Sequence, residues 1–187
     1  MITDLRPRAR RQRAAPTIDI VLESPLWKAQ RGVRTVLQRA IGEAAAMTAV
    51  SGGKAALAAT SGGELAIVLT DDSAIRALNR DWRGKDQPTN VLSFPAPAPS
   101  GSRPGQPGAV RLMGDIVIAY ETVEREARAE QRPFAHHLAH LAVHGFLHLV
   151  GHDHAVETEA DAMEALEIAV LARLDVPNPY LLRDAEA

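Results

Sequence analysis

The chain has 187 residues, of which 46% are hydrophobic and 24% charged, a balance typical of one globular domain large enough to bury a core. The lack of cysteine excludes disulfides and thiolate metal ligands, and no run of about 18 apolar residues predicts a transmembrane helix. The net charge of −2 disfavours a uniformly basic coat for nucleic acid. No apolar segment follows the N-terminal arginines to form a secretory signal, so we expect a cytoplasmic protein.

The chain is expected to begin with a flexible basic arm, residues 1–16. Five arginines and one aspartate between residues 1 and 13 give this arm a net charge of +4. Such an arm is typical of a disordered, solubilising tail, and contact with phosphates is the alternative. Residues 17–180 are predicted to form one metal-binding domain.

Within that domain, strand and helix patterns alternate along the chain. Alternating or continuous β-branched and apolar runs predict strands at 17–24, 64–70, 89–96 and 113–120. Helical patterns with capping signals cover 33–50, 73–82, 121–131, 133–150 and 157–174. Between the last two strands, residues 95–109 are so rich in proline and glycine that we expect a loop insertion. Four strands and about five helices indicate an α/β (α+β) domain.

The predicted helix at 133–150 combines an apolar circumference with a stripe of histidines. All seven histidines of the chain lie between residues 136 and 154. A helix that is apolar on almost every side is normally buried, so histidines on it need partners. His144 and His148 stand one turn apart, and a turn at Gly151 can fold His154 back towards them. Three imidazoles with no thiolate leave one coordination position open, which favours a catalytic Zn²⁺, one per chain.

The remaining polar residues near this stripe have less specific predictions. His140 is expected to act in a second shell around the metal or in the core, with a fourth ligand as the alternative, and Asp153 to orient a ligand, accept a proton or shape the turn. His136 and His137 are interpreted as ordinary polar positions near the start of the helix.

The spacing of these histidines, "HGFLHLVGHDH" at 144–154, matches the zinc-protease pattern H-E-x-x-H-x-x-G-x-x-H except at one position. Gly145 stands where such a protease keeps its glutamate base. Another group must therefore act as base, or the substrate must bring its own nucleophile, as the 2′-hydroxyl of RNA does. The pattern is compatible with phosphodiester chemistry, and a peptide or amide hydrolase remains the alternative.

The same stretch resembles the H-G-x-L-H-L-x-G-[YH]-D-H signature of the YbeY family of metal-dependent endoribonucleases. Three further blocks are similar to that family in the same order: "LNRDWRGKDQPTNVLSFP" at 78–95, "MGDIVIA" at 113–119 and "EADAMEALE" at 159–167. The resemblance implies a mixed four-stranded sheet and a metzincin-like site in which His144, His148 and His154 hold zinc. It also implies cleavage of single-stranded precursor rRNA, notably at the 3′ end of the small-subunit 16S rRNA, and a part in ribosome quality control. The small ribosomal subunit and assembly factors are the implied partners.

The family's catalytic residues would be His144 and Arg83, the latter in a cationic turn with Lys85. A guanidinium binds phosphate with two hydrogen bonds, and Lys85 is a weaker candidate for RNA contact. The alternative for Arg83 is a surface ion pair with Asp81 or Asp86. Trp82 is predicted to lie in the core, the alternative being a surface ring that stacks on an unpaired base. A non-catalytic assembly factor with structural zinc is the third functional class.

Overall fold

The structure, a computed structural model, describes residues 15–51, 62–97, 111–152 and 156–181. Its elements follow in the order β1 (Thr17–Leu22), η1 (Pro25–Ala29), α1 (Val33–Ser51), β2 (Gly63–Thr70), α3 (Asp72–Arg83), β3 (Val91–Pro95), β4 (Arg111–Ala119), α4 (Tyr120–Ala129), α5 (Phe134–Leu149) and α6 (Glu157–Ala172). The described ranges thus contain four strands and five α-helices, as predicted. Most of the basic arm, much of the proline-rich loop, and Asp153 and His154 lie outside them.

The four strands form one mixed sheet in the order β1-β2-β4-β3. Strands β1, β2 and β4 are parallel, and β3 pairs with β4 in the antiparallel direction. Parallel neighbours need a crossover connection, which α1 and η1 supply between β1 and β2. The mixed four-stranded sheet implied by the family resemblance is therefore confirmed, with β3 as an edge strand beside α5.

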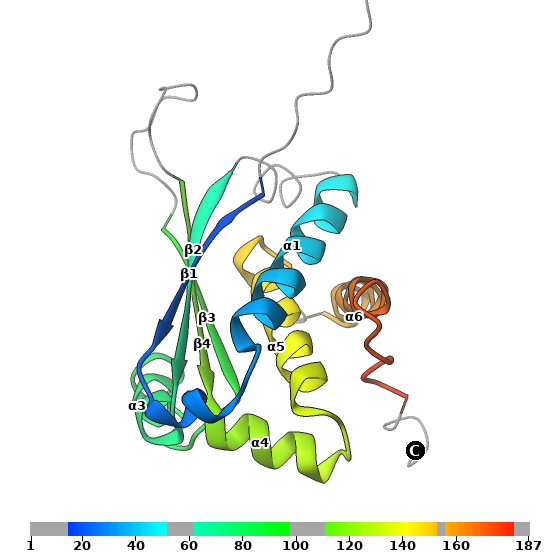
Figure 1. Ribbon diagram of the computed structural model, residues 1–187. Coiled ribbons are helices and arrows are strands. Elements are labelled where there is room, and N and C mark those ends of the chain that lie inside the picture. Colours follow the sequence, from blue (N-terminus) through cyan, green and yellow to red (C-terminus); the bar gives the residue numbers. More distant parts are fainter. Residues whose placement is uncertain (1–14, 52–61, 98–110, 153–155, 182–187) are drawn as a thin grey trace, which may run out of the picture.

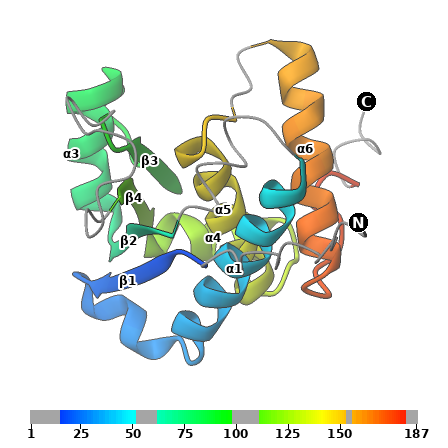
Figure 2. The ribbon, with the colours of Figure 1, turned by 90° about the horizontal axis from the view of Figure 1, so that it is seen from above.

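The two faces of the sheet are covered unequally (Figure 1). Helices α1 and α5 pack on one face, and α6 lies outside them, as the view from above shows (Figure 2). On the opposite face the described residues contribute α3, near the β3 and β4 side. A large cavity of about 1020 Å³ remains open on that face.

Helix α5 is the central element of the covered face. Leu138, Ala142, Val143, Phe146 and Leu147 have no exposed surface. Burying one such large apolar side chain stabilises a fold by about 1.5–3 kcal/mol, so this helix is held firmly in place. The prediction of a buried helix that carries the histidines is confirmed. None of the described helices is long and apolar enough to cross a bilayer.

The two tryptophans occupy places that the sequence did not predict. Trp27, on the unpredicted 3-10 helix η1, is the core residue: it is 1% exposed and its indole Nε1 donates to the Thr70 carbonyl at 2.7 Å. Trp82 is 71% exposed, so the prediction of a core position was wrong. It sits in the last turn of α3, where its ring meets Phe94 edge to face at 5.6 Å between centroids.

Candidate active site

His144 and His148 face one another on the side of α5 that borders an open cleft. Their Nε2 atoms are 3.1 Å apart, and the ring planes are almost perpendicular, at 80°. The i, i+4 spacing explains why the two rings project from the same face of the helix. At this distance one ring donates its N–H to the other, and the same two nitrogens are also placed to bind one shared metal ion.

The orientation of the His144 ring is fixed from behind by Glu167 of α6. Nδ1 of His144 lies 2.8 Å from one carboxylate oxygen, while the other oxygen accepts from Nε2 of His140 at 2.9 Å and from the hydroxyl of Tyr180. Glu167 is only 1% exposed. Burial raises the pKa of its carboxyl, but the hydrogen bonds from His140 and His144 outweigh burial and bring the pKa to about 2.

This contact determines the tautomer of His144. An ionised carboxylate only accepts hydrogen bonds, so Nδ1 of His144 must carry the proton, and Nε2 presents its lone pair towards His148. Metal-binding histidines use such a carboxylate partner in many proteins. Two nitrogens bound to one tetrahedral zinc ion at about 2.0–2.1 Å each would lie about 3.3 Å apart, close to the spacing seen here. The donor set therefore fits a metal.

The chain turns back immediately after α5. Gly151 has a φ of +95°, a conformation that favours glycine, and the N–H of His152 donates to the carbonyl of Leu147 at 3.0 Å. The predicted turn is thus confirmed, but the predicted third ligand, His154, lies outside the described residues. Within the described ranges no group of three or more His, Asp or Glu side chains is placed to hold a metal ion.

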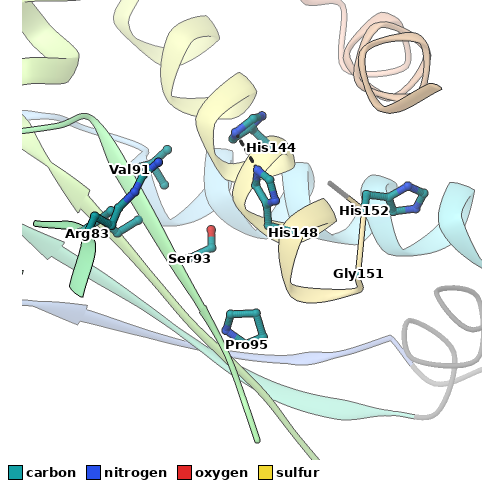
Figure 3. Close-up of a pocket in the computed structure, with 9 residues that line it drawn as sticks. Arg83, Val91, Ser93, Pro95, His144, His148, Gly151 and His152 are labelled. Atoms are coloured by element: carbon teal, nitrogen blue, oxygen red, sulfur yellow. Dashed lines mark hydrogen bonds between the residues drawn. The ribbon is translucent and has the colours of Figure 1, made fainter. Parts of the chain in front are cut away.

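His152, which follows α5, differs from the histidines of the helix in its surroundings. Burial lowers the pKa of its imidazole, and its Nε2 has no hydrogen-bond partner among the described residues. Figure 3 shows its ring pointing away from His144 and His148.

Arg83 reaches the same cleft from the strand side. Figure 3 shows it across the pocket from the two histidines, beside Val91 of β3. The two carboxylates considered as its partners are occupied by other arginines: Asp86 pairs with Arg76 and Asp81 with Arg80, both at 2.8 Å. Since Arg83 has no hydrogen bond or ion pair with any described residue, its guanidinium is available to a ligand in the cleft.

Together these groups line a cleft of about 430 Å³ that is open to solvent. Its walls are the end of α3, the edge strand β3 and the end of α5; the lining residues include Arg83, Ser93, Pro95, His144, His148 and Gly151. Two imidazoles and a guanidinium thus converge on one space without a carboxylate in its described lining.

Gly145 explains how α5 comes so close to the sheet. A Cβ atom at this position would lie 3.0 Å from a side-chain carbon of Ile116 and 3.1 Å from Oγ of Ser93. Ile116 has no exposed surface and cannot move away into solvent. A side chain at position 145 would therefore push these neighbours apart by a few tenths of an ångström, so the packing disfavours the glutamate that a zinc protease carries there.

Three further residues were singled out in the sequence, namely His140, Lys85 and His137. His140 contacts Glu167, which in turn contacts His144, so its predicted second-shell role is compatible with the geometry. Lys85 is exposed and does not line the cleft. The interpretation of His137 as an ordinary polar position was wrong: it is 5% exposed and bound to Glu126 at 2.7 Å.

Sequence reasoning missed three residues of the site. Glu167, Tyr180 and Ser93 were not singled out, although Glu167 and Ser93 lie within stretches that resemble the family. A buried acidic position on the apolar side of α6 was the signal that could have revealed Glu167, because buried carboxylates need partners.

Comparison with known proteins agrees with this geometry. The sequence model of the YbeY endoribonuclease family matches residues 28–175. A protein named endoribonuclease YbeY from Bradyrhizobium sp. is 50% identical over 173 residues, which cover 92% of this chain and 97% of the relative. Its counterpart from Rhodopseudomonas palustris strain BisA53 is 52% identical over 169 residues, covering 90% and 92%, and that from Nitrobacter hamburgensis is 50% identical over 167 residues, covering 89% and 83%. The chain therefore belongs to the YbeY family of endoribonucleases, enzymes that cut RNA chains internally.

Proposed function

We propose that this endoribonuclease cleaves single-stranded precursor rRNA with one Zn²⁺ ion held by His144, His148 and His154. The observation that carries the proposal is the pair of Nε2 atoms 3.1 Å apart, facing the same cleft as an arginine without a carboxylate partner among the described residues. Processing of the 3′ end of the 16S rRNA and ribosome quality control are the roles that the family resemblance suggests. Work in the cytoplasm, with the small ribosomal subunit and assembly factors as partners, belongs to the same proposal.

A zinc ion bound there would supply a Lewis acid and lower the pKa of bound water. The chain's own residues supply the rest. Glu167 holds the His144 ring with Nε2 towards the cleft, which keeps the ligand in one tautomer. Arg83 binds the scissile phosphate with two hydrogen bonds and offsets the charge that grows on its oxygens in the transition state.

Two other functional classes fit the residues less well. A metzincin-like peptide or amide hydrolase needs an acid/base beside the first ligand, but this chain has Gly145 there, and packing against Ile116 and Ser93 disfavours a side chain at that position. A purely structural zinc is normally enclosed by four protein ligands. Here the histidine pair lies on an open cleft instead, which favours a catalytic ion.

The test separates metal binding from phosphate binding. We expect His144→Ala to lose both metal and cleavage of a precursor rRNA fragment, whereas Arg83→Glu loses cleavage by at least about 100-fold and keeps the metal. Metal content by mass spectrometry and RNA cleavage on gels are measured on the same preparations. His136→Ala, a histidine on the same helix outside the cleft lining, is the matched control and should retain both properties.

Casein is offered in parallel with the RNA. Cleavage of casein but not of RNA would contradict the proposal. A metal-loaded wild type that cuts neither substrate would instead favour the structural-zinc class.

A further inference from the structure

An aromatic pair on the open face of the sheet is not used by the mechanism above. Trp82 is 71% exposed, and its ring contacts Phe94 of β3 edge to face. Exposure of a large aromatic ring to water is unfavourable in free energy. A ring that packs against a second ring is also held in a fixed orientation. Since Trp82 immediately precedes Arg83, its backbone is anchored where the phosphate-binding arginine leaves α3.

The groove that contains this pair borders the active-site cleft across the edge strand β3. It is the cavity of about 1020 Å³ on the α3 face, and Ser93 and Pro95 of the edge strand line both it and the cleft. Strand β3 is the edge of the sheet, so no further strand lies between the cleft on one side of it and the groove on the other. Arg83 and Trp82 therefore stand on the two sides of one short strand.

The charges of the groove select which part of an RNA chain can enter it. Its described lining is mostly apolar, with three carboxylates, Asp19, Glu64 and Asp115, and no lysine or arginine. Carboxylates repel phosphates, which stay on the side of Arg83. A base carries no charge, its face stacks on aromatic rings, and its amino groups donate hydrogen bonds to carboxylates.

We propose that Trp82 and Phe94 form a stacking subsite for an unpaired base adjacent to the phosphate at Arg83. The position of that phosphate rests on the proposed function, whereas base binding at Trp82 is measurable without cleavage. The subsite accounts for a preference for single strands, because a base in a duplex is stacked on its neighbours and cannot reach the ring.

The chain offers a direct optical test. It has two tryptophans, and Trp27 is buried against Thr70, so a ligand that stacks on an indole affects the emission of Trp82. A short unstructured RNA is titrated into the protein in the presence of EDTA, beside an oligomer of the same backbone with abasic positions. We expect the RNA to quench the emission of the wild type and the abasic oligomer to leave it nearly unchanged, with no quenching by RNA in Trp82→Phe.

Cleavage kinetics give the second readout. Trp82→Ala should raise KM for the short RNA roughly tenfold while kcat is kept, and Trp82→Phe should restore most of that loss because it retains an aromatic face. Leu26→Ala is the matched control: Leu26 is 40% exposed and lines neither the groove nor the cleft, so its removal should not change KM.

Equal quenching by the abasic oligomer, or an unchanged KM in Trp82→Ala, would overturn the subsite and leave the groove to a protein partner. If the wild type quenches with RNA but cuts none, the proposed function fails and the subsite stands. Thermal unfolding of each variant is recorded, and Trp82→Phe, a change at a largely exposed ring, keeps the test valid if Trp82→Ala does not fold.

Discussion

Helix α5 presents four histidines on one stripe, and they divide into two pairs with different partners. His137 and His140, in the first half, each face a carboxylate: Glu126 at 2.7 Å and Glu167 at 2.9 Å. His144 and His148, in the second half, face each other at 3.1 Å on an open cleft. The same side chain on the same face of one helix thus serves packing in one half and a ligand site in the other.

The two pairs differ in the hydrogen-bond partner of each imidazole. In the first pair a carboxylate binds Nε2 of each ring and holds the ring in place, while the buried Nδ1 atom of each has no hydrogen-bond partner among the described residues. In the second pair Glu167 holds the proton of His144 on Nδ1, so Nε2 of His144 can accept a hydrogen bond from Nε2 of His148 or bind a metal ion with its lone pair. Glu167 touches one member of each pair, which makes it the residue that separates the two environments.

Three substitutions test this comparison, at Glu167, Gly145 and Glu126. Removal of the Glu167 charge should have the largest effect. We expect Glu167→Gln to weaken zinc binding about 10- to 100-fold, because the amide no longer fixes the proton on Nδ1 of His144. Competition with a chromophoric chelator measures the affinity, and imidazole ¹⁵N shifts of the metal-free protein report the tautomer.

Glu164→Gln provides the matched control. Glu164 lies one turn earlier on α6 and is exposed, so the same substitution there should leave both readouts unchanged. Should Glu167→Gln bind zinc as tightly as wild type with an unaltered tautomer, Glu167 has only a packing role and the division between the two pairs loses its cause.

The features of the two pairs that depend only on neighbouring residues could be predicted from the sequence. The stripe on α5, the i, i+4 pair and the turn at Gly151 follow from helical periodicity and glycine chemistry alone. The partners that distinguish the pairs were not, because Glu126 and Glu167 stand 11 and 27 residues away from His137 and His140. Their contacts depend on how α4 and α6 pack against α5, which no short-range pattern encodes.

The fold shows the same limit. The positions of the strands and helices followed from periodicity, but the sheet order did not. Trp82 was misassigned because an apolar ring next to a helix end is equally compatible with core and surface, and only the place of α3 at the sheet edge decides. The choice between a surface ion pair and a cleft position for Arg83 was likewise settled by neighbours, since Arg76 and Arg80 take the nearby carboxylates.

A smaller effect is expected at Gly145, which lets the second histidine pair approach the sheet. Gly145→Ala should lower the free energy of unfolding by about 1–2 kcal/mol, because the added methyl overpacks the contact with Ile116 and Ser93. Chemical denaturation measures the change.

Gly42 on α1 is the matched control. An added Cβ there meets nothing within 4 Å, so Gly42→Ala should stabilise the protein by about 0.5–1 kcal/mol through helix propensity. Equal stabilisation by both substitutions would show that α5 can move from the sheet and that Gly145 is not required by packing.

The smallest effect is expected in the first pair, at Glu126. Burial raises the pKa of its carboxyl, and hydrogen bonds with His137 and Asn90 lower it by more, so the net pKa lies below the ordinary value. A carboxyl with a lowered pKa stabilises the folded state above its ordinary pKa, and this contribution is lost as the pH falls through the lowered value. Glu126→Gln should therefore cost about 1 kcal/mol at neutral pH and almost nothing below that range.

Unfolding curves of the wild type and Glu126→Gln across this pH range measure the difference, with Glu23→Gln, a change at an exposed position, as the reference for general charge effects. A cost that persists unchanged at acidic pH would mean that Glu126 acts through its shape. In that case the carboxylate is not what satisfies His137, and the contrast with the histidines of the cleft would rest on Glu167 alone.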